Sequence, residues 1–267
     1  MFLKKEDLHL FSEKGYIKLP LLKSQAIQAI QDLYEKTKNE SGISCKNFFT
    51  TIWSDNQIYK ENVGKGLKAI LEPALNQYLQ NFQSVFANFM IKKAGENSQL
   101  QPHQDWSFTD EEKYFSITAW IPLIDVDKKN GALQVLPKSQ LLNNHPRARF
   151  AHAPFGDKLD YISQNLMKSI PMKAGEVLMI NSRTIHASPP NMSNEDRIAV
   201  SIVLIPQEAP MKHWVLDKEN PDQAYEMNIA ANFFTEYSCF DYPDTTKAEK
   251  FAKLGKTQLT IDKLEHA

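Results

Sequence analysis

The stretch EVLMINSRTIHASPPNMSNEDRIAVSIVLI, residues 176–205, consists of two apolar runs separated by a polar segment. Residues 176–180 and 197–205 are rich in Val, Ile and Leu, side chains that favour β-strands. Proline, asparagine and serine are frequent between the runs, which is typical of a connection between strands. The stretch therefore predicts two strands, with His186 shortly after the first and Arg197 at the start of the second.

Similar runs lie upstream, and they indicate a larger β-structure. Apolar or β-branched segments bounded by Gly, Pro and Asn occupy residues 85–93, 115–124 and 132–136. Their spacing predicts an antiparallel barrel or sandwich.

Helical patterns flank this β-region. Apolar residues recur at helical spacing in residues 4–14, 24–38 and 67–82, with a short strand predicted at 15–20. Residues 138–170 form a long polar insertion, expected to be a loop with a short helix near 159–167. A loop of this length inside a compact domain is more often functional, such as a lid, than idle. After Pro206 we expect an irregular chain followed by helix, so the prediction is a mainly β fold with flanking helices.

The composition excludes several classes of protein. The 267 residues have ordinary apolar and charged fractions and a net charge of −1, which fits a soluble globular protein and gives no support for nucleic-acid binding. The N-terminus lacks the apolar core of a signal peptide, and no apolar run is long enough for a transmembrane helix. The two cysteines, Cys45 and Cys239, lack CxxC spacing, which excludes a disulfide-dense scaffold and fits a cytoplasmic location.

The segment Pro102-His103-Gln104-Asp105-Trp106 contains a candidate metal-binding pair. In extended chain, residues two apart point to the same face, so His103 and Asp105 can reach one ion. His186, which follows a predicted strand through polar residues, is the best candidate for a third ligand. Two histidines and one carboxylate on one face of an octahedron leave three open positions, an arrangement that suits Fe(II) oxygenases.

An isolated His-x-Asp pair is more often an ordinary surface feature than a metal site. The other histidines lie in polar terminal segments or lack a carboxylate two residues away. We expect them to be surface or packing residues: His9, His145, His152, His213 and His266.

Arg197 is the feature that strengthens the metal pair. It lies eleven residues after His186, and the turn-rich residues between them predict a hairpin that sets Arg197 beside the strand of His186. A fixed guanidinium can bind a carboxylate through two parallel hydrogen bonds, so it can anchor an anionic cosubstrate that chelates the metal at its other end. The alternative is a surface arginine paired with Asp196 or Glu195.

At this point the sequence resembles the phytanoyl-CoA dioxygenase family. The resemblance covers roughly residues 6–206 and rests on an ordered set of motifs: Phe11-Ser12-Glu13-Lys14-Gly15-Tyr16-Ile17, His103-Gln104-Asp105, Ala119-Trp120, Asn130-Gly131-Ala132-Leu133, Val135-Leu136-Pro137-Lys138-Ser139 and the spacing of His186 and Arg197. It implies a double-stranded β-helix (jelly-roll, cupin-like) core at about 83–206 within a single domain, between a helical part at 1–82 and an extension at 207–267. It also implies Fe(II), 2-oxoglutarate as cosubstrate and O2.

The family's functional residues are carried over position by position. His103, Asp105 and His186 match the iron ligands, and Arg197 matches the residue that pairs with the distal carboxylate of 2-oxoglutarate. Further candidates for the cosubstrate site are Thr118, Trp120 and Ser201, although a core tryptophan is an equally good interpretation of Trp120. For Asn88, Phe89 and Lys93, on the strand before the metal motif, the register is not fixed by sequence.

The resemblance implies that 2-oxoglutarate is decarboxylated to succinate while a small-molecule metabolite is hydroxylated. The carboxylate of Asp105 argues against halogenation, because halogenases of this broad class carry a small residue there. Desaturation or cyclisation of a natural product remains an alternative. So do a jelly-roll isomerase that uses neither O2 nor 2-oxoglutarate, and a non-catalytic metal-binding protein. The chain is expected to act as a monomer or homodimer.

Four residues bear on the substrate. Arg147 and Arg149, in the insertion, could grip an acidic substrate, but surface charges are the simpler interpretation. Trp106 and Phe108, next to the metal motif, could line the substrate pocket or pack in the core.

Overall fold

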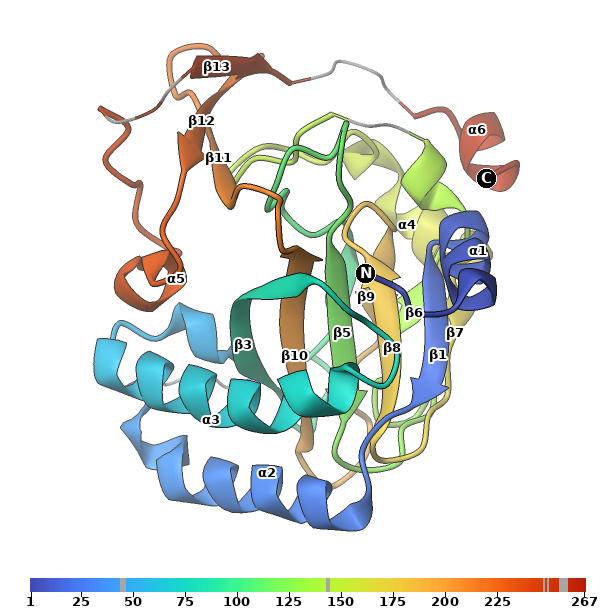
Figure 1. Ribbon diagram of the computed structural model, residues 1–267. Coiled ribbons are helices and arrows are strands. Elements are labelled where there is room, and N and C mark those ends of the chain that lie inside the picture. Colours follow the sequence, from blue (N-terminus) through green and yellow to red (C-terminus); the bar gives the residue numbers. More distant parts are fainter. Residues whose placement is uncertain (44–46, 143–144, 247, 249, 255–258) are drawn as a thin grey trace.

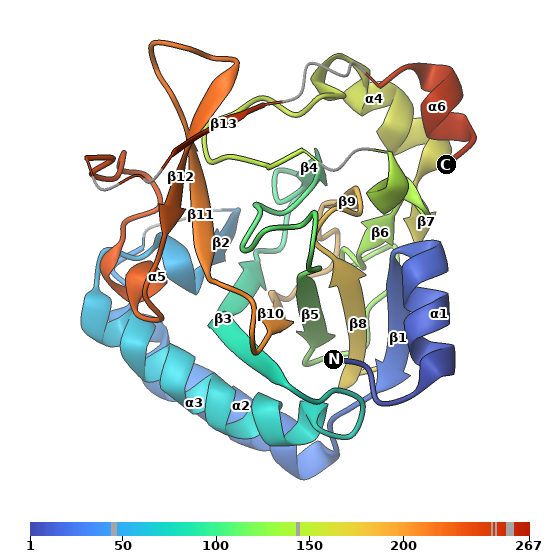
Figure 2. The same ribbon diagram turned by 45° about the horizontal axis from the view of Figure 1, so that its top comes forward.

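The computed structural model describes residues 1–43, 47–142, 145–246, 248, 250–254 and 259–267. Its centre is formed by two antiparallel sheets (Figures 1 and 2). The major sheet has six strands, in the order β1 (Tyr16–Pro20), β8 (Glu176–Asn181), β5 (Ile117–Pro122), β10 (Arg197–Pro206), β3 (Phe82–Lys92) and β2 (Phe48–Thr50). The minor sheet has four, in the order β4 (Leu100–His103), β9 (His186–Ser188), β6 (Gln134–Val135) and β7 (Lys168–Ser169). The expected mainly β fold with antiparallel sheets is confirmed.

Helix α3 (Gln57–Leu75) runs across the outer face of the major sheet in Figure 1, and α2 (Ser24–Thr37) packs beside α3. Helix α1 (Lys5–Lys14) packs beside β1. Ile30, Leu67 and Leu71 are fully buried in the same cluster as the sheet's outward-facing side chains. Helix α3 begins ten residues earlier than predicted because the Asn56 side chain accepts a hydrogen bond from the main-chain N–H of Tyr59, which caps the helix. Short 3-10 turns follow α2 and β2: η1 (Lys38–Glu40) and η2 (Thr51–Trp53).

Alternation along β10 decides which side chains face the interior between the sheets. Its even-numbered residues from 200 to 204 belong to the core under the helices. Arg197 and Ser201 therefore point the other way, since successive side chains of a strand lie on opposite faces. The register places Trp120 and Asn88 opposite Ser201, on the same inner face. Thr118, two residues before Trp120, shares that face.

The insertion contains the short helix that the sequence predicted. Its helical elements are η3 (Ser139–Leu141), η4 (Gly156–Lys158), α4 (Leu159–Tyr161) and the helical turn η5 (Ile162–Leu166), and β7 lies at its end. Both views show α4 beside the C-terminal helix α6 (Ile261–Glu265) (Figures 1 and 2).

The expectation of helix after Pro206 was wrong for most of that segment. Residues there form a separate three-stranded sheet of β11 (Lys212–Leu216), β12 (Gln223–Asn228) and β13 (Lys250–Lys253), and among the described residues of this segment only α5 (Phe233–Glu236) and α6 are helical. Trp214 and Ala224 of this sheet bury against Ala148 of the insertion. Tertiary packing overrides weak local preference here.

None of the helices in the described part of the chain is long and apolar enough to cross a membrane. Cys239 is a buried free thiol, and Cys45 lies outside the described residues.

Candidate metal centre

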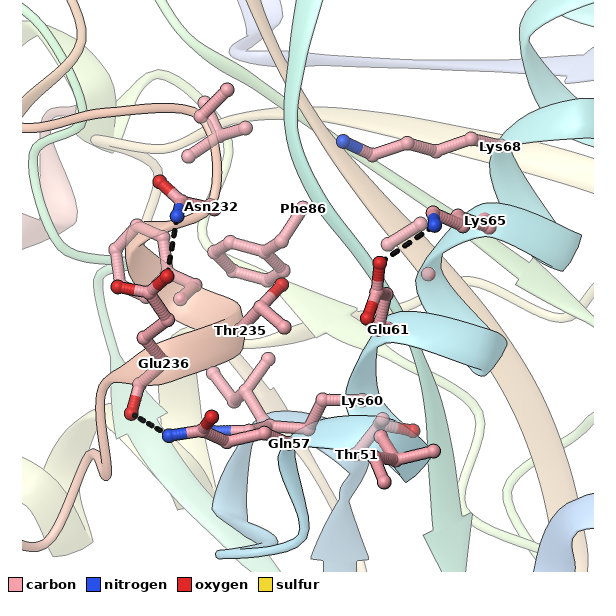
Figure 3. Close-up of a pocket in the computed structure, with 17 residues that line it drawn as sticks. Thr51, Gln57, Lys60, Glu61, Lys65, Lys68, Phe86, Asn232, Thr235 and Glu236 are labelled. Carbon is pink, nitrogen blue, oxygen red and sulfur yellow. Dashed lines mark hydrogen bonds and ion pairs between the residues drawn. The ribbon is translucent and has the colours of Figure 1, made fainter.

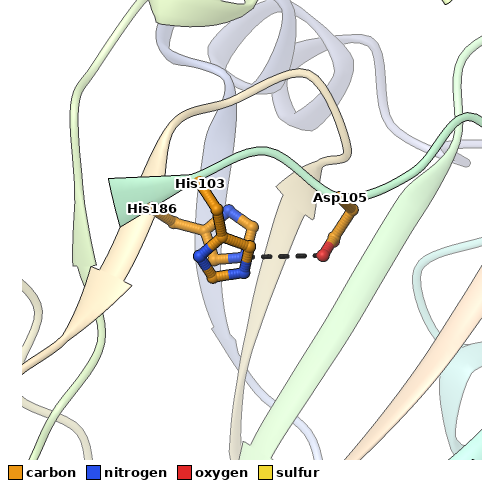
Figure 4. Close-up of side chains that lie close together, drawn as sticks. All are labelled: His103, Asp105 and His186. Carbon is orange, nitrogen blue, oxygen red and sulfur yellow. Dashed lines mark ion pairs between the residues drawn. The ribbon is translucent and has the colours of Figure 1, made fainter. Parts of the chain in front are cut away.

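The side chains of His103 and Asp105 meet that of His186, which is distant in sequence, between the sheets (Figure 4). His103 ends β4 and His186 begins β9, and these two strands pair with His103 directly opposite His186. Asp105 follows two residues after His103. One potential ligand atom from each of the three lies within 4.8 Å of the other two, and Asp105 Oδ1 is 3.6 Å from His186 Nε2.

Main-chain carbonyls fix both imidazoles in one orientation. The Nδ1 of His103 lies 2.8 Å from the carbonyl of Gln101, and the Nδ1 of His186 lies 2.9 Å from the carbonyl of Thr184. A carbonyl only accepts hydrogen bonds, so each Nδ1 carries the proton and each Nε2 keeps a free lone pair. This is the usual outer arrangement of histidine ligands in metal sites.

Asp105 is held on three sides. Thr118 donates a 2.5 Å hydrogen bond to Oδ2 of Asp105. The main-chain N–H of Asp105 donates to the carbonyl of Ser182, and the main-chain carbonyl of Asp105 accepts from Arg147 Nε at 2.6 Å. Burial, and then the neighbouring His186, lower the pKa of His103. A neutral imidazole is the form that binds metals, so the donor set of two neutral nitrogens and one carboxylate fits Fe(II).

Arg197 is buried in the same interior, with 1% of its surface exposed. Among the described residues its Nε and Nη1 have no hydrogen-bond partner, and its Cζ lies 5.1 Å from the centre of the Trp120 ring, whose Nε1 is also unpaired. Burial lowers the pKa of Arg197 to about 9, which still leaves it cationic at neutral pH. A buried cation without an anion is costly, so this guanidinium fits an anionic ligand such as the far carboxylate of 2-oxoglutarate.

The predicted hairpin between His186 and Arg197 was wrong. Strand β10 pairs with β3 and β5 of the major sheet, whereas β9 pairs with β4 and β6 of the minor sheet. The connection crosses from one sheet to the other, and Arg197 still faces the interior. Pairing of Arg197 with Asp196 is also excluded, because Asp196 bonds Lys93 at 2.6 Å on the surface.

Lys92 is a buried residue that the sequence interpretation missed. It lies opposite Arg197 in the sheet and donates to the carbonyls of Ser98 (2.6 Å), Ser188 (3.1 Å) and Pro189 (2.7 Å). Burial, and then the charge of Arg197, lower its pKa to about 6. Because Ser188 and Pro189 lie two and three residues after His186, Lys92 fixes the segment that follows this histidine. A lysine near the end of the predicted strand 85–93 was the available signal.

The remaining sequence candidates occupy clear positions. Ser201 accepts a 2.7 Å hydrogen bond from Asn88 Nδ2 on the inner face, whereas Phe89 faces the helices. Phe108 packs in an aromatic cluster with Phe86, so it does not line the cavity beside the metal centre.

Arg147 and Arg149 are not plain surface charges. Arg147 forms a bidentate ion pair with Glu111, at 2.6 and 2.7 Å, and both side chains are at most one-tenth exposed. Arg149 is half-buried, and its guanidinium lies over the rings of Trp106 and Phe150.

A cavity of about 360 Å³ adjoins the metal centre. It is lined by His103, Gln104 and Trp106 on one side and by residues 145–154 of the insertion on the other, with Leu254 at its edge. A second cavity, of about 440 Å³, lies between α3 and α5 (Figure 3). It contains none of the three clustered side chains, and its lysines are engaged: Lys60 with the Tyr237 carbonyl, Lys65 with Glu61 and Lys68 with the Ser84 carbonyl.

Two facing antiparallel sheets with two histidines and a carboxylate between them define a jelly-roll protein with a facial-triad site. Residues 11–199, well over half of the chain, match the family model described as "Phytanoyl-CoA dioxygenase (PhyH)". The chain therefore belongs to the phytanoyl-CoA dioxygenase family.

The chain is similar to phytanoyl-CoA dioxygenase from Arabidopsis thaliana, with 29% identity over 144 residues, 51% of this chain and 50% of that protein. Phytanoyl-CoA dioxygenase 1 from Oryza sativa subsp. japonica is 28% identical over 145 residues, covering 52% and 51%. The chain spans about half the length of the curated relatives it matches.

Solved structures with the same fold include SnoK, a non-haem α-ketoglutarate-dependent carbocyclase from nogalamycin biosynthesis (TM-score 0.54, 18% identity, covering 78% of this chain and 86% of that one). Another is HygX from Streptomyces hygroscopicus with nickel and 2-oxoglutarate bound (TM-score 0.55, 15% identity, covering 77% and 88%). At these identities the likeness concerns the fold.

Proposed function

We propose that this protein is an Fe(II)- and 2-oxoglutarate-dependent dioxygenase that hydroxylates a small-molecule metabolite. In this proposal His103, Asp105 and His186 bind the iron, and Arg197 holds the distal carboxylate of 2-oxoglutarate. The observation that carries it is the cluster of three ligand atoms within 4.8 Å, facing the same interior as a buried arginine. Family membership and the cofactors of structural neighbours such as HygX support it.

The protein's own residues would bind, orient and shield the reactants. The carbonyls of Gln101 and Thr184 keep the Nε2 atoms of both histidines turned to the metal. Thr118 holds the carboxylate of Asp105, and Trp120 stacks beside Arg197. Bound Fe(II) and 2-oxoglutarate would together activate O2 for attack on a C–H bond, with release of succinate. The buried walls exclude water, which strengthens the grip of Arg197 on a carboxylate.

Desaturation or cyclisation would use the same site and differ only in how the substrate lies. SnoK is a carbocyclase and a related structure, SnoN, is an epimerase, so this fold accommodates reactions other than hydroxylation. An isomerase or a non-catalytic metal-binding protein would have no use for a buried, unpaired Arg197. Absence of succinate formation would favour those two alternatives.

Anaerobic titration with Fe(II) and 2-oxoglutarate tests the proposal. The chelate should give a weak visible charge-transfer band. His103→Ala should abolish the band, and Arg197→Ala should weaken 2-oxoglutarate binding while iron still binds. His9→Ala, which removes an exposed histidine of α1, is the matched control. The proposal is wrong if both site variants behave like the parent protein, or if no succinate forms when O2 is admitted.

A further inference from the structure

We propose that the cavity beside the metal centre binds the substrate as a compact organic carboxylate, held by Arg149 with its apolar body against Trp106 and Phe150. The inference rests on the proposed function for the reaction, but the binding site itself does not depend on iron.

The position of the cavity makes it the natural place for a substrate. His103 and Gln104 of the metal motif form part of its wall, and residues 145–154 of the insertion cover the opposite side. A molecule in this cavity would lie against a proposed iron ligand. The insertion thus acts as a wall of the site rather than as an idle loop.

The charge of the cavity is one-sided. Among the described residues that line it there is no aspartate or glutamate, whereas two arginines and three histidines are present. Arg147 is neutralised by its bidentate ion pair with Glu111. The net positive charge of the wall therefore comes from Arg149.

Arg149 has no acidic partner among the described residues. Its Nε and Nη2 donate to the main-chain carbonyl of Cys239, and it also bonds the Tyr237 phenol, so both partners are uncharged. A half-buried guanidinium in this position would gain a charge-assisted hydrogen bond from an incoming carboxylate. Its charge opposes the upward shift that burial imposes on the pKa of Tyr237.

Two aromatic rings hold the guanidinium in place. Its Cζ lies 5.0 Å from the centre of the Trp106 ring and 4.4 Å from that of Phe150, distances at which cation–π attraction operates. Phe150 has a φ of 69°, a left-handed conformation that is strained for a bulky side chain. Such strain persists where the surroundings impose it, often at ligand sites. The rings and the cation together offer a flat apolar surface with a fixed positive end.

The size of the cavity limits the ligand. A volume of about 360 Å³ is at the low end for small-molecule sites, which run from roughly 300 to 1,000 Å³. A carboxylic acid with one ring or a short chain fits inside such a volume. Because the cavity is open to solvent on one side, its volume limits the part of the ligand that lies between His103 and Arg149.

Matched acid and amide pairs test the inference, because they differ in charge and hardly in shape. The probes are phenylacetate with phenylacetamide and indole-3-acetate with indole-3-acetamide, titrated calorimetrically into the full chain in the presence of saturating 2-oxoglutarate. At least one acid should bind roughly tenfold or more tightly than its amide, as one charge-assisted hydrogen bond allows. Arg149→Gln should erase this preference. Arg197→Ala should keep it, and so should Lys218→Met, which removes a cation outside the cavity.

Each other outcome overturns the inference. If the amides bound as tightly as the acids, the charge of the ligand would play no part in binding. Equal loss of acid and amide binding in Arg149→Gln would mean that Arg149 has a structural role. No binding of any acid in the millimolar range to the parent protein would show that the cavity does not bind carboxylates of this size. Repeating the titration on metal-free protein separates this inference from the proposed function. If the parent protein gave no charge-transfer band, the proposed function would be wrong, but the preference of the cavity for acids could still be observed.

Discussion

The hydroxyl of Thr118 donates a 2.5 Å hydrogen bond to Oδ2 of Asp105, which leaves Oδ1 turned toward His186, 3.6 Å away. Thr118 belongs to the major sheet and Asp105 follows a strand of the minor sheet, so this bond joins the two sheets at the metal centre. Sequence reasoning placed Thr118 against the cosubstrate, and the structure places it against a proposed iron ligand.

Thr118→Val should weaken Fe(II) binding by about tenfold or more, because outer hydrogen bonds of metal ligands contribute on that scale. Without the bond, the carboxylate is free to rotate away from the two histidines. Anaerobic Fe(II) titration measures the change. Thr118→Ser keeps the hydroxyl and should bind iron nearly as the parent does. Equal affinity in the Val and Ser variants would contradict the role given to this bond.

The buried pair of Arg147 and Glu111 should matter for both stability and the metal. Arg147→Met would leave the Glu111 charge buried and unpaired, at a cost of about 3–5 kcal/mol of unfolding free energy. It would also remove the donor to the Asp105 carbonyl. Urea unfolding and Fe(II) titration measure the two effects.

The double variant Arg147→Met, Glu111→Met separates these effects. Replacing both charges by apolar side chains should recover much of the stability, because no charge is then left unpaired. The iron affinity should stay reduced, since the Asp105 carbonyl still lacks its donor. If affinity recovered together with stability, Arg147 would act only through the fold.

His213 should make stability fall in acid. It is fully buried among the rings of Trp106, Phe233 and Tyr237, and burial, followed by the charge of Arg149, lowers its pKa from 6.5 to about 3. The unfolded chain binds a proton below about pH 6.5 that the folded chain refuses. The stabilisation that comes from neutral, buried His213 is therefore fully present above that pH. Below it, the free energy of unfolding falls by up to about 1.4 kcal/mol per pH unit.

Urea unfolding of chelator-treated protein between about pH 5 and pH 7 measures this dependence. His213→Phe preserves the aromatic packing and should reduce the slope of stability against pH by about one proton. Identical slopes for the parent and the Phe variant would show that His213 is accessible to protons in the folded state.

Lys92 and Lys93 are neighbours in sequence and should differ sharply. Lys92→Met leaves three carbonyls without their donor inside the protein, at about 1–3 kcal/mol for each unsatisfied group. Lys93→Met breaks only the surface ion pair with Asp196 and should cost less than about 1 kcal/mol. Urea unfolding compares the two. Similar losses would mean that water reaches the carbonyls around Lys92.

The two histidines and the aspartate could be singled out from sequence because local geometry carries that information. Residues two apart on extended chain share a face, and His186 follows an unmistakable strand. Arg197 stood out for its place at the start of an apolar run. The strand pairing around it could not be foreseen, since a turn-rich segment of this length suits either a hairpin or a crossing between sheets.

The partners of the site were beyond sequence reasoning for a different reason. Lys92 and Arg147 look like ordinary charged residues until the fold surrounds them with carbonyls or with Glu111. The strands after Pro206 were missed as well, because they are short and owe their form to contacts such as that of Trp214 with the insertion. Burial and long-range pairing decide such features, and the local amino-acid sequence does not reveal either of them.

The crossing between β9 and β10 puts the imidazoles on one sheet and the Arg197 guanidinium on the other. A dicarboxylate bound at the metal through one end and at Arg197 through the other would link the two sheets. Cosubstrate occupancy should then slow hydrogen exchange at the facing strands of both layers, far beyond the few residues it touches, so the enzyme would be stiffest when loaded for turnover.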